Sequence, residues 1–346
     1  MRQRSWPHLM RLWRNSVIDS LVDAHYLPIA LEALKAFPVQ LEDIQPICRS
    51  ENVTFRVIPR IGQTHYALRL HRPGYNSLAE LNSERQWTRA LKESGLAVPE
   101  SLATTNGDHF YPVYIEATGE QCLSGMTTWL EGNPLNEYLA ACTQLIARER
   151  IYRQIGVMTA KSHNQSTLWQ EPPGFQRRTL DAEGLVGENP HWGRFWEHAS
   201  LNRSESRLLQ RARQKIHVAL CHLGMEPMTF SLIHADLNAD NIIYENGKLA
   251  MIDFDDSAYG WHMYDIATTL FEERNHPDFA SLRAALFDGY QEHRSLGERE
   301  LSTLDLFLLI RGLALIGWFH QRPEHDERQY FRELKDAICA ECEKFY

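Results

Sequence analysis

The sequence predicts an α+β protein built as two lobes, and two observations carry this prediction. Up to residue 131 the chain has the pattern of short strands around one main helix, whereas helical periodicity dominates from residue 132 to 346. A short strand, a loop and a β-hairpin interrupt the helical part between residues 230 and 252. We therefore expect an N-terminal lobe with an antiparallel sheet and a leading helix (1–131), and a larger, mostly helical C-terminal lobe (132–346) that carries the loop.

The elements of the N-terminal lobe follow from alternating apolar residues and from helix signals. Strands are expected at 41–48, 53–59, 64–71, 111–117 and 121–129. A helix at 17–37 precedes them. The main helix, 77–94, begins after Ser77, which is followed three residues later by Glu80 in the capping-box pattern, and Gly95 ends it.

The elements of the C-terminal lobe follow from apolar residues at helical spacing. Helices are expected at 135–143, 144–166, 204–222, 263–271, 279–293, 301–319 and 327–344. The segment 171–191 contains three prolines and three glycines and has no regular pattern. It would be either a lid over a binding site or an exposed connection.

Composition excludes several classes of protein. A net charge of −9 argues against nucleic acid or an anionic membrane as the main partner. The longest apolar run, 304–319, is interrupted by Asp305 and Arg311 and is shorter than a membrane span of about 18 residues. The arginine-rich first residues lack the apolar core of a secretory signal, and six scattered cysteines form no disulfide framework. We expect a cytoplasmic protein, and the sequence leaves its oligomeric state open.

The most informative segment is Phe230–Asp256, FSLIHADLNADNIIYENGKLAMIDFDD. It places His234, Asp236 and Asn241 in the spacing H-x-D-x-x-x-x-N, and Asp253 follows twelve residues later after an apolar strand. Phosphoryl transfer requires a carboxylate that accepts the hydroxyl proton, and oxygen ligands that hold magnesium against nucleotide phosphates. We therefore predict that Asp236 is the catalytic base and that Asn241 and Asp253 are the magnesium ligands.

The same residues have a plainer interpretation. Asp236 and Asn241 are residue types that often form turns, His234 would then be a core histidine, and Asp253 would cap a helix. The local order favours the chemical interpretation, because a strand, a loop and a hairpin with a turn at Asn246-Gly247 place an aspartate where phosphoryl transfer needs one. We assign His234 to the catalytic loop, as a hydrogen-bonding buttress rather than a proton carrier.

The segments HADLNADN and MIDFDDSAYGWHMYDIA resemble the aminoglycoside phosphotransferase and choline kinase superfamily, which has the protein-kinase-like fold. Within it the chain is most similar to the bacterial branch that contains homoserine kinase and the stress-response kinase A group. The resemblance extends from about Cys48 to Arg322 and is more specific in the C-terminal lobe. It implies a kinase that uses ATP and Mg²⁺, and it implies that Asp265 ties its helix to the catalytic loop.

The resemblance also implies that residues 1–131 form the nucleotide-binding lobe. The lysine that pairs with nucleotide phosphates should lie in the strand YALRL, where this chain has Arg69, which keeps the charge but changes the geometry. Glu84 corresponds to the helix glutamate that pairs with this cation. A glycine-rich phosphate loop is missing from the sequence, and Ser50 and Asn52 would cover the phosphates instead.

The hinge between the lobes corresponds to residues 127–132, where the backbone of Thr128 and Leu130 would bind adenine. Plainer alternatives stay open for the N-terminal lobe. Arg69 would then be a solvent-facing strand residue, and Glu84 an ordinary exposed glutamate.

Three functions remain open from the sequence. The first is an ATP- and Mg²⁺-dependent phosphotransferase acting on a hydroxyl of a small molecule, with homoserine as a named candidate and an amino-containing acceptor if Asp255 or Asp256 binds a cationic group. The second is a protein Ser/Thr kinase of the stress-response type, although about a dozen residues between Asp253 and Asp265 leave no room for a long activation segment. The third is an inactive kinase fold that serves as a binding module, to which Arg69 and Ala235 lend slight support.

Overall fold

The structure is a computed structural model that describes residues 25–49, 52–115, 119–323 and 328–345. The chain divides into two compact units. Unit 1 comprises residues 1–141, 170–176 and 242–255, and unit 2 comprises residues 142–169, 177–241 and 256–346. The predicted α+β class is confirmed, because the N-terminal part forms an antiparallel sheet and the C-terminal part is mainly helical.

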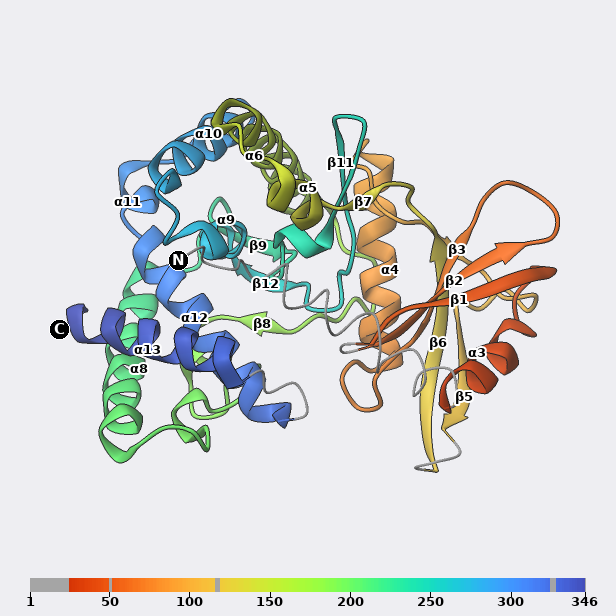
Figure 1. The fold of residues 1–346 in the computed structure, drawn as a ribbon, viewed down its shortest axis with the longest axis horizontal. Coiled ribbons are helices and arrows are strands. Elements are labelled where there is room, and N and C mark those ends of the chain that lie inside the picture. The colour runs from red at the N-terminus through yellow and green to blue at the C-terminus, as the bar shows by residue number, and fades with distance from the viewer. Residues whose placement is uncertain (1–24, 50–51, 116–118, 324–327, 346) are drawn as a thin grey trace. The chain divides into compact units, whose positions relative to one another are not determined.

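Within the described residues, unit 1 is built on a six-stranded antiparallel sheet (Figure 1). Its strands are β1 (Leu41–Arg49), β2 (Val53–Pro59), β3 (Tyr66–Leu70), β4 (Ser101–Leu102), β5 (Phe110–Ile115) and β6 (Glu120–Thr128). They are arranged in the order β1-β2-β3-β6-β4, and β5 also pairs with β6. Every second residue of β2 is buried, as expected of a strand with one face against a core. The five predicted strands are confirmed, and the two-residue strand β4 is additional.

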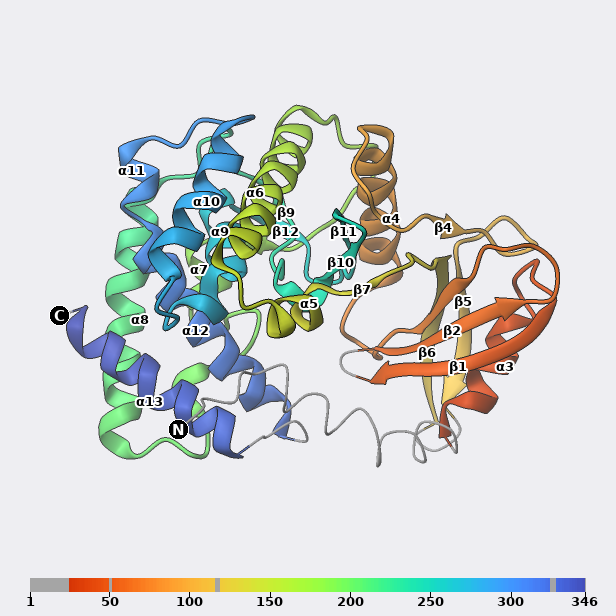
Figure 2. The ribbon, with the colours of Figure 1, turned by 45° about the horizontal axis from the view of Figure 1, so that its top comes forward.

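The helices of unit 1 are α3 (Leu27–Leu34), α4 (Leu78–Glu93) and α5 (Leu135–Ala141). Helix α3 lies along the sheet (Figures 1 and 2) and buries Ile29, Ala30 and Ala33 in the same core as residues of β2 and β3. The predicted helix 17–37 is therefore confirmed in part, and its residues before 25 lie outside the described residues.

Helix α4 begins where the sequence predicts. The Ser77 hydroxyl accepts a hydrogen bond from the Glu80 N–H, and the Glu80 carboxylate accepts one from the Ser77 N–H, so the capping box is formed. On the apolar face of the helix, the Trp87 ring packs edge-on against Phe254, with 5.6 Å between the ring centroids.

A second, three-stranded sheet in unit 1 joins β7 (Asn133–Pro134), β10 (Ile242–Glu245) and β11 (Lys248–Met251) in the order β11-β10-β7. Asn246 (φ 49°) and Gly247 (φ 82°) both have the positive φ of a two-residue hairpin turn. The predicted hairpin is thereby confirmed. It brings the chain to Phe254, which packs on α4, immediately after Asp253.

Unit 2 consists mainly of helices. They are α6 (Leu145–Leu168), α7 (Ala182–Val186), α8 (Arg203–Leu223), α9 (His262–Leu270), α10 (Phe279–Gln291), α11 (Glu298–Leu301), α12 (Leu304–Gln321) and α13 (Arg328–Lys344), with short 3₁₀ turns at Phe195–Glu197, Ala239–Asn241 and Phe271–Glu273. A small sheet has the order β8-β12-β9. Its strands are β8 (Thr179–Leu180), β9 (Phe230–Ile233) and β12 (Ala258–Trp261).

Helices α6 and α10 lie side by side in both views (Figures 1 and 2). Two glycines make this close packing possible. A Cβ atom on Gly156 would lie 2.1 Å from the Leu286 carbonyl oxygen, and one on Gly289 would lie 2.0 Å from the Arg153 carbonyl oxygen. The backbones of the two helices therefore approach more closely than any side chain permits.

One expectation for the C-terminal part is refined and another is corrected. The helix predicted at 301–319 is confirmed as α12, which begins three residues later, at Leu304. Leu301 is the last residue of α11, after which the hydroxyls of Ser302 and Thr303 donate to the carbonyls of Arg299 and Glu300. An exposed connection does not describe the segment 171–191, because it contains β8 and α7. Asp181 caps α7 by accepting the Gly184 N–H at 2.8 Å, a local signal that the glycines and prolines obscured.

In the described part of the chain, the stretch Glu298–Gln321 is long and apolar enough to cross a membrane by length and composition. Of its most apolar window, 61% is buried inside the protein. The core helix of a globular protein meets the same criteria.

Candidate active site

The loop that follows β9 is held by Asp265, a buried residue in the first turn of α9. One oxygen of Asp265 accepts the His234 N–H at 2.9 Å, and the other accepts the Ala235 N–H at 2.7 Å. Ala235 has a φ of 65°, a left-handed conformation that costs about 1–2 kcal/mol for a residue with a side chain. The two hydrogen bonds to a carboxylate offset this cost, so the predicted tie between Asp265 and the loop is confirmed.

Within unit 2, the Asp236 carboxylate accepts hydrogen bonds from the side chains of Arg311, Asn238 and Asn241. Arg311 Nη2 donates to its Oδ1 at 2.5 Å, and Asn238 Nδ2 donates to the same oxygen at 3.1 Å. Asn241 Nδ2 donates to Oδ2 at 2.8 Å. The side chain is 24% exposed. Asp236 is therefore an oriented carboxylate that solvent can reach, as a residue that accepts a proton from a small substrate requires.

The sequence placed His234 beside Asp236 as a buttress, and its contacts have that character. The ring is buried, and its Nδ1 lies 3.4 Å from the Asp236 backbone nitrogen, which donates to it. The backbone of His234 is in turn bound to Asp265. The residue thus restrains the loop on both sides of Ala235.

Asn241 is brought to Asp236 by the 3₁₀ turn Ala239–Asn241. In addition to its bond with the carboxylate, Asn241 Nδ2 donates to the Asp236 carbonyl at 2.9 Å. Because the amide nitrogen has this role, the side-chain carbonyl oxygen is the atom that Asn241 can offer to a cation. A neutral oxygen of this kind suits a hard divalent ion.

A buried layer of aromatic and imidazole groups lies behind Asp265. His163 Nε2 lies 3.2 Å from Asp265 Oδ2, and His163 Nδ1 lies 2.8 Å from the Tyr290 hydroxyl. The His262 ring stacks on His163 with 4.3 Å between centroids. Burial lowers the pKa of both histidines well below the usual value, and the charge of Arg294 adds to the effect. Both rings are neutral at pH 7, so His163 donates to the carboxylate and accepts from the tyrosine.

Burial also raises the pKa of the Asp265 carboxyl. The backbone N–H groups of His234 and Ala235 and the charge of Arg311 oppose that increase. The hydrogen bonds that hold the loop are therefore the same contacts that favour the ionised form of Asp265.

In unit 1, Arg69 on β3 is bound to two aspartates. Arg69 Nη2 lies 2.6 Å from Asp253 Oδ1 and 3.3 Å from Asp255 Oδ2. Burial by itself lowers the pKa of Arg69, but the charges of Asp253, Asp255 and Glu84 outweigh it and the pKa is raised. Arg69 is thus a permanently charged group beside carboxylates and not a solvent-facing strand residue, and Glu84 is close enough to contribute to its electrostatics.

Asn52 belongs to the same network. Its Nδ2 donates to Asp255 Oδ2, and its Oδ1 accepts the Arg72 N–H at 3.2 Å. The role of Asn52 in covering phosphates stays a prediction, and Ser50 lies outside the described residues. His71 Nδ1 lies 4.0 Å from Asp255 Oδ1, and burial lowers the pKa of His71 to about 4.

The predicted hinge follows β6. The Thr128 N–H donates to the Glu100 carbonyl at 2.8 Å, and the Thr128 hydroxyl accepts the Glu100 N–H at 2.9 Å. The amide of Thr128 is therefore engaged within unit 1 and is not the donor that adenine would use. A hinge role for Leu130 stays a prediction.

Asp253 has a φ of 65°, which is uncommon for a residue other than glycine and is often found at functional sites. Its carboxylate and the Asn241 carbonyl oxygen are the two oxygen donors that the sequence assigns to magnesium. This donor chemistry fits a hard cation, which in nucleotide sites takes one or two carboxylates together with phosphates and waters. Across the described residues, no group of three or more His, Cys, Asp and Glu side chains could hold a metal ion.

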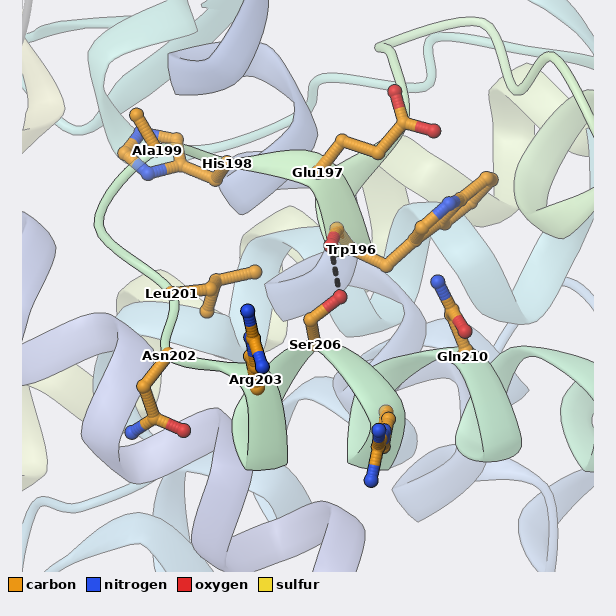
Figure 3. A pocket seen from close by; sticks show the side chains of 10 residues that line it. Trp196, Glu197, His198, Ala199, Leu201, Asn202, Arg203, Ser206 and Gln210 are labelled. Carbon is orange, nitrogen blue, oxygen red and sulfur yellow. Dashed lines mark hydrogen bonds between the residues drawn. The ribbon is translucent and has the colours of Figure 1, made fainter.

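A pocket of about 560 Å³ in unit 2 lies between the turn Phe195–Glu197 and the start of α8 (Figure 3). The Ser206 hydroxyl donates to the Trp196 carbonyl at its centre, at 2.7 Å. The pocket contains no residue that the sequence assigns to catalysis or to cofactor binding. Its size is therefore no argument for an active site there, and the residues that the sequence assigns to catalysis lie at the loop after β9.

Comparison with known proteins decides the family. Residues 43–301 match the model of the phosphotransferase enzyme family. The chain belongs to this family. It is accordingly a phosphotransferase, and the predicted enzyme class and family are confirmed.

Similar proteins include kinases of several kinds. Amicoumacin kinase of Bacillus subtilis is 22% identical over 307 residues, which cover 86% of this chain and 85% of the relative. The homoserine kinase of Agrobacterium fabrum is 29% identical over 167 residues, 47% of this chain and 48% of the relative, so the match spans about half of that protein.

Solved structures confirm the kinase-like fold. A microcompartment-associated aminopropanol kinase has a TM-score of 0.79 and 27% identity, covering 91% of this chain and 95% of the other. The amicoumacin kinase hAmiN, solved with AMP-PNP, Ca²⁺ and Ami, has a TM-score of 0.75 and 19% identity, covering 93% and 96%.

Sequence reasoning missed two contacts of Asp236. Asn238 lies inside the motif but was not assigned, although an asparagine two residues after an aspartate commonly bonds to it in a turn. In the sequence, Arg311 is a charge that interrupts an apolar run. A charge at the centre of a buried helix is a signal that could have been followed to a carboxylate partner.

Proposed function

We propose that this chain transfers the γ-phosphate of ATP, in the presence of Mg²⁺, to a hydroxyl group of a small molecule, with Asp236 as the catalytic base. The observation that carries the proposal is the fixed orientation of the Asp236 carboxylate. It accepts hydrogen bonds from Asn238, Asn241 and Arg311, and it lies in a loop whose backbone is bound to Asp265. Phosphoryl transfer depends on positioning and electrostatics more than on covalent chemistry, so a fixed carboxylate is the part the protein must supply.

In this mechanism the acceptor hydroxyl donates its hydrogen bond to Asp236. The carboxylate orients the attacking oxygen toward the phosphorus and takes the proton as the new bond forms. His234 and Asp265 keep the loop in place, because each binds a backbone nitrogen of the segment 234–236.

Magnesium, when bound with ATP, neutralises charge on the β- and γ-phosphates. The sequence assigns the Asn241 side-chain oxygen and the Asp253 carboxylate to it as ligands. Arg69 carries a permanent positive charge next to Asp253 and would pair with the nucleotide phosphates in place of the usual lysine.

An amino alcohol is the acceptor class that we favour. The structural neighbour that covers nearly the whole chain at 27% identity is an aminopropanol kinase, and the partial matches include homoserine kinases. Both names denote small molecules that carry a hydroxyl and an amine. A protein acceptor has less support, because the thirteen residues from Asp253 to Asp265 contain β12 and the start of α9 rather than a long activation segment.

The test is a panel of acceptors assayed for ADP formation and for the phosphorylated product by ³¹P NMR. The panel contains 1-amino-2-propanol, homoserine, ethanolamine, choline, an aminoglycoside and a generic protein. We expect ADP formation to depend on one of the small amino alcohols. Phosphate found only on protein, or no nucleotide-induced rise in melting temperature at millimolar Mg-ATP, would reject the proposal.

The catalytic assignment is tested with Asp236→Asn. Its kcat should fall by about 10²–10⁴-fold. ATP affinity should change little, because the lost proton acceptor acts only in the transition state. Asp288→Asn, an exposed carboxylate on α10, is the matched control and should leave kcat unchanged.

A further inference from the structure

Helix α12 contains one charge at its buried centre. Arg311 is 8% exposed, and its helix neighbours Ile310 and Leu313 are buried apolar residues. Removing a guanidinium from water is costly unless it is paired and hydrogen-bonded. We therefore expect the Arg311 guanidinium to have an acidic partner, and we expect the buried charge to have a role.

The partner is the catalytic loop. Arg311 Nη2 lies 2.5 Å from Asp236 Oδ1. Burial alone lowers the pKa of Arg311, but the interactions with Asp236 and Tyr264 outweigh it and the pKa is raised. The guanidinium is a fixed cation in contact with the proposed base.

Stability is a poor reason to keep this pair. Exchanging a buried ion pair for apolar residues of similar volume is often neutral or stabilising, so packing alone would favour an apolar residue at position 311. The geometry suggests another reason. Arg311 binds Oδ1 of Asp236 while Asn241 binds Oδ2, and two donors on opposite oxygens determine the orientation of the carboxylate plane.

We propose that Arg311 is a positioning residue that holds the Asp236 carboxylate in the orientation required by the acceptor hydroxyl. This inference rests on the proposed function of Asp236. Arg311 acts through Asp236 and does not touch the reacting atoms. Its loss should lower the rate of the chemical step and leave substrate binding nearly intact, because a misplacement of about 1 Å can cost about 10²-fold in rate.

Chemical rescue tests the proposal. In Arg311→Ala we expect kcat to fall by about 10²-fold, with KM for ATP and for the acceptor nearly unchanged. Guanidinium ion added to the variant should restore kcat in a saturable manner, by filling the space beside Asp236. Arg311→Lys keeps the charge but lacks the planar fork, so it should fold well and recover only part of the rate.

The matched control is Arg294→Ala. Arg294 is also buried (7% exposed) and donates to Asn164 Oδ1 at 2.7 Å and to the Met228 carbonyl. This variant should lose thermal stability, and guanidinium should not raise its kcat. A normal kcat in Arg311→Ala overturns the proposal. So does a rise in the acceptor KM at unchanged kcat, which would make Arg311 a substrate-binding residue.

A thermal-unfolding cycle gives a readout that does not depend on activity. Arg311→Met should lower the melting temperature by several degrees in the wild type, where it leaves the Asp236 charge without its partner. In the Asp236→Asn background the same change should have little effect. Additive shifts overturn the proposal. If no acceptor is phosphorylated by the wild type, the proposed function fails, and this cycle still decides whether Arg311 holds residue 236.

Discussion

Arg69 and Asp253 form an ion pair of 2.6 Å within unit 1, although 184 residues separate them in the sequence. One residue stands where a nucleotide-binding lysine is expected, and the other is the predicted magnesium ligand. Their contact means that the cation of β3 and the acidic segment after β11 influence each other. The negative charge of Asp253 raises the pKa of Arg69, and the charges of Asp255 and Glu84 add to this effect.

Arg69→Met should weaken the binding of Mg-ATP by about tenfold or more, since a hydrogen bond to a charged group contributes about 1.5–3 kcal/mol. Arg69→Lys keeps the charge and should lose less. Titration calorimetry with AMP-PNP and Mg²⁺ measures the affinity. Arg60→Met, an exposed arginine in the turn after β2, is the control. Equal affinities in wild type and Arg69→Met would exclude Arg69 from nucleotide binding.

Asp265→Asn should destabilise the protein. The amide has one acceptor oxygen for the two backbone N–H groups of His234 and Ala235, so one buried donor loses its partner, at a cost of about 1–3 kcal/mol. Because the loop carries Asp236, kcat should also fall. Urea unfolding and steady-state kinetics measure the two effects. Asp305→Asn, an exposed carboxylate in the first turn of α12, should change stability by less than about 0.5 kcal/mol.

Most of the fold could be predicted because its signals are local. The capping box of Ser77 and Glu80 and the hairpin turn at Asn246-Gly247 are each encoded within four residues, and the structure forms both. The short strands β7 and β8 were not predictable in this way. Each has only two residues and forms by pairing with a strand that is distant in the sequence. Thr179 of β8, for example, pairs with Tyr259 of β12. Two residues are too few to give a periodic sequence pattern.

In the candidate site, too, contacts between residues that are close in the sequence could be predicted, and contacts between distant residues could not. The spacing H-x-D-x-x-x-x-N predicts that Asp236 and Asn241 lie together, and a five-residue separation joined by a 3₁₀ turn brings them into contact. The contact of Arg311 with Asp236 spans 75 residues and depends on how α12 packs. Sequence periodicity specifies which face of a helix is buried, but not which loop that face meets.

Stability should decrease as pH falls below about 6.5, because His163 and His262 are buried and neutral. Their folded-state pKa values are depressed below the unfolded value of about 6.5, so the unfolded state binds more protons in acid. The stabilisation is complete above pH 6.5 and is lost as pH drops toward the folded pKa values. Each histidine contributes a slope of up to about 1.4 kcal/mol per pH unit.

Urea unfolding of the wild type and of His163→Gln between pH 7.5 and 5.0 measures this effect. Glutamine can still exchange hydrogen bonds with Tyr290 and Asp265 but does not titrate, so the variant should have the shallower pH dependence. Parallel curves for the two proteins would show that His163 is protonated equally in the folded and unfolded states.

Gly156→Ala should destabilise unit 2 by more than a typical surface substitution. The added methyl group would lie 2.1 Å from the Leu286 carbonyl oxygen on α10, and a backbone atom cannot move aside as a flexible side chain can. Overpacking of this kind costs about 1–3 kcal/mol, and more where two helices must separate. Alanine is otherwise the better helix residue by about 1 kcal/mol, so a loss would isolate the steric effect. Gly297→Ala is the control, because its Cβ would meet only the Glu300 carboxylate at 3.4 Å. A Gly156→Ala protein as stable as the control would mean that α6 and α10 do not pack backbone to backbone in solution.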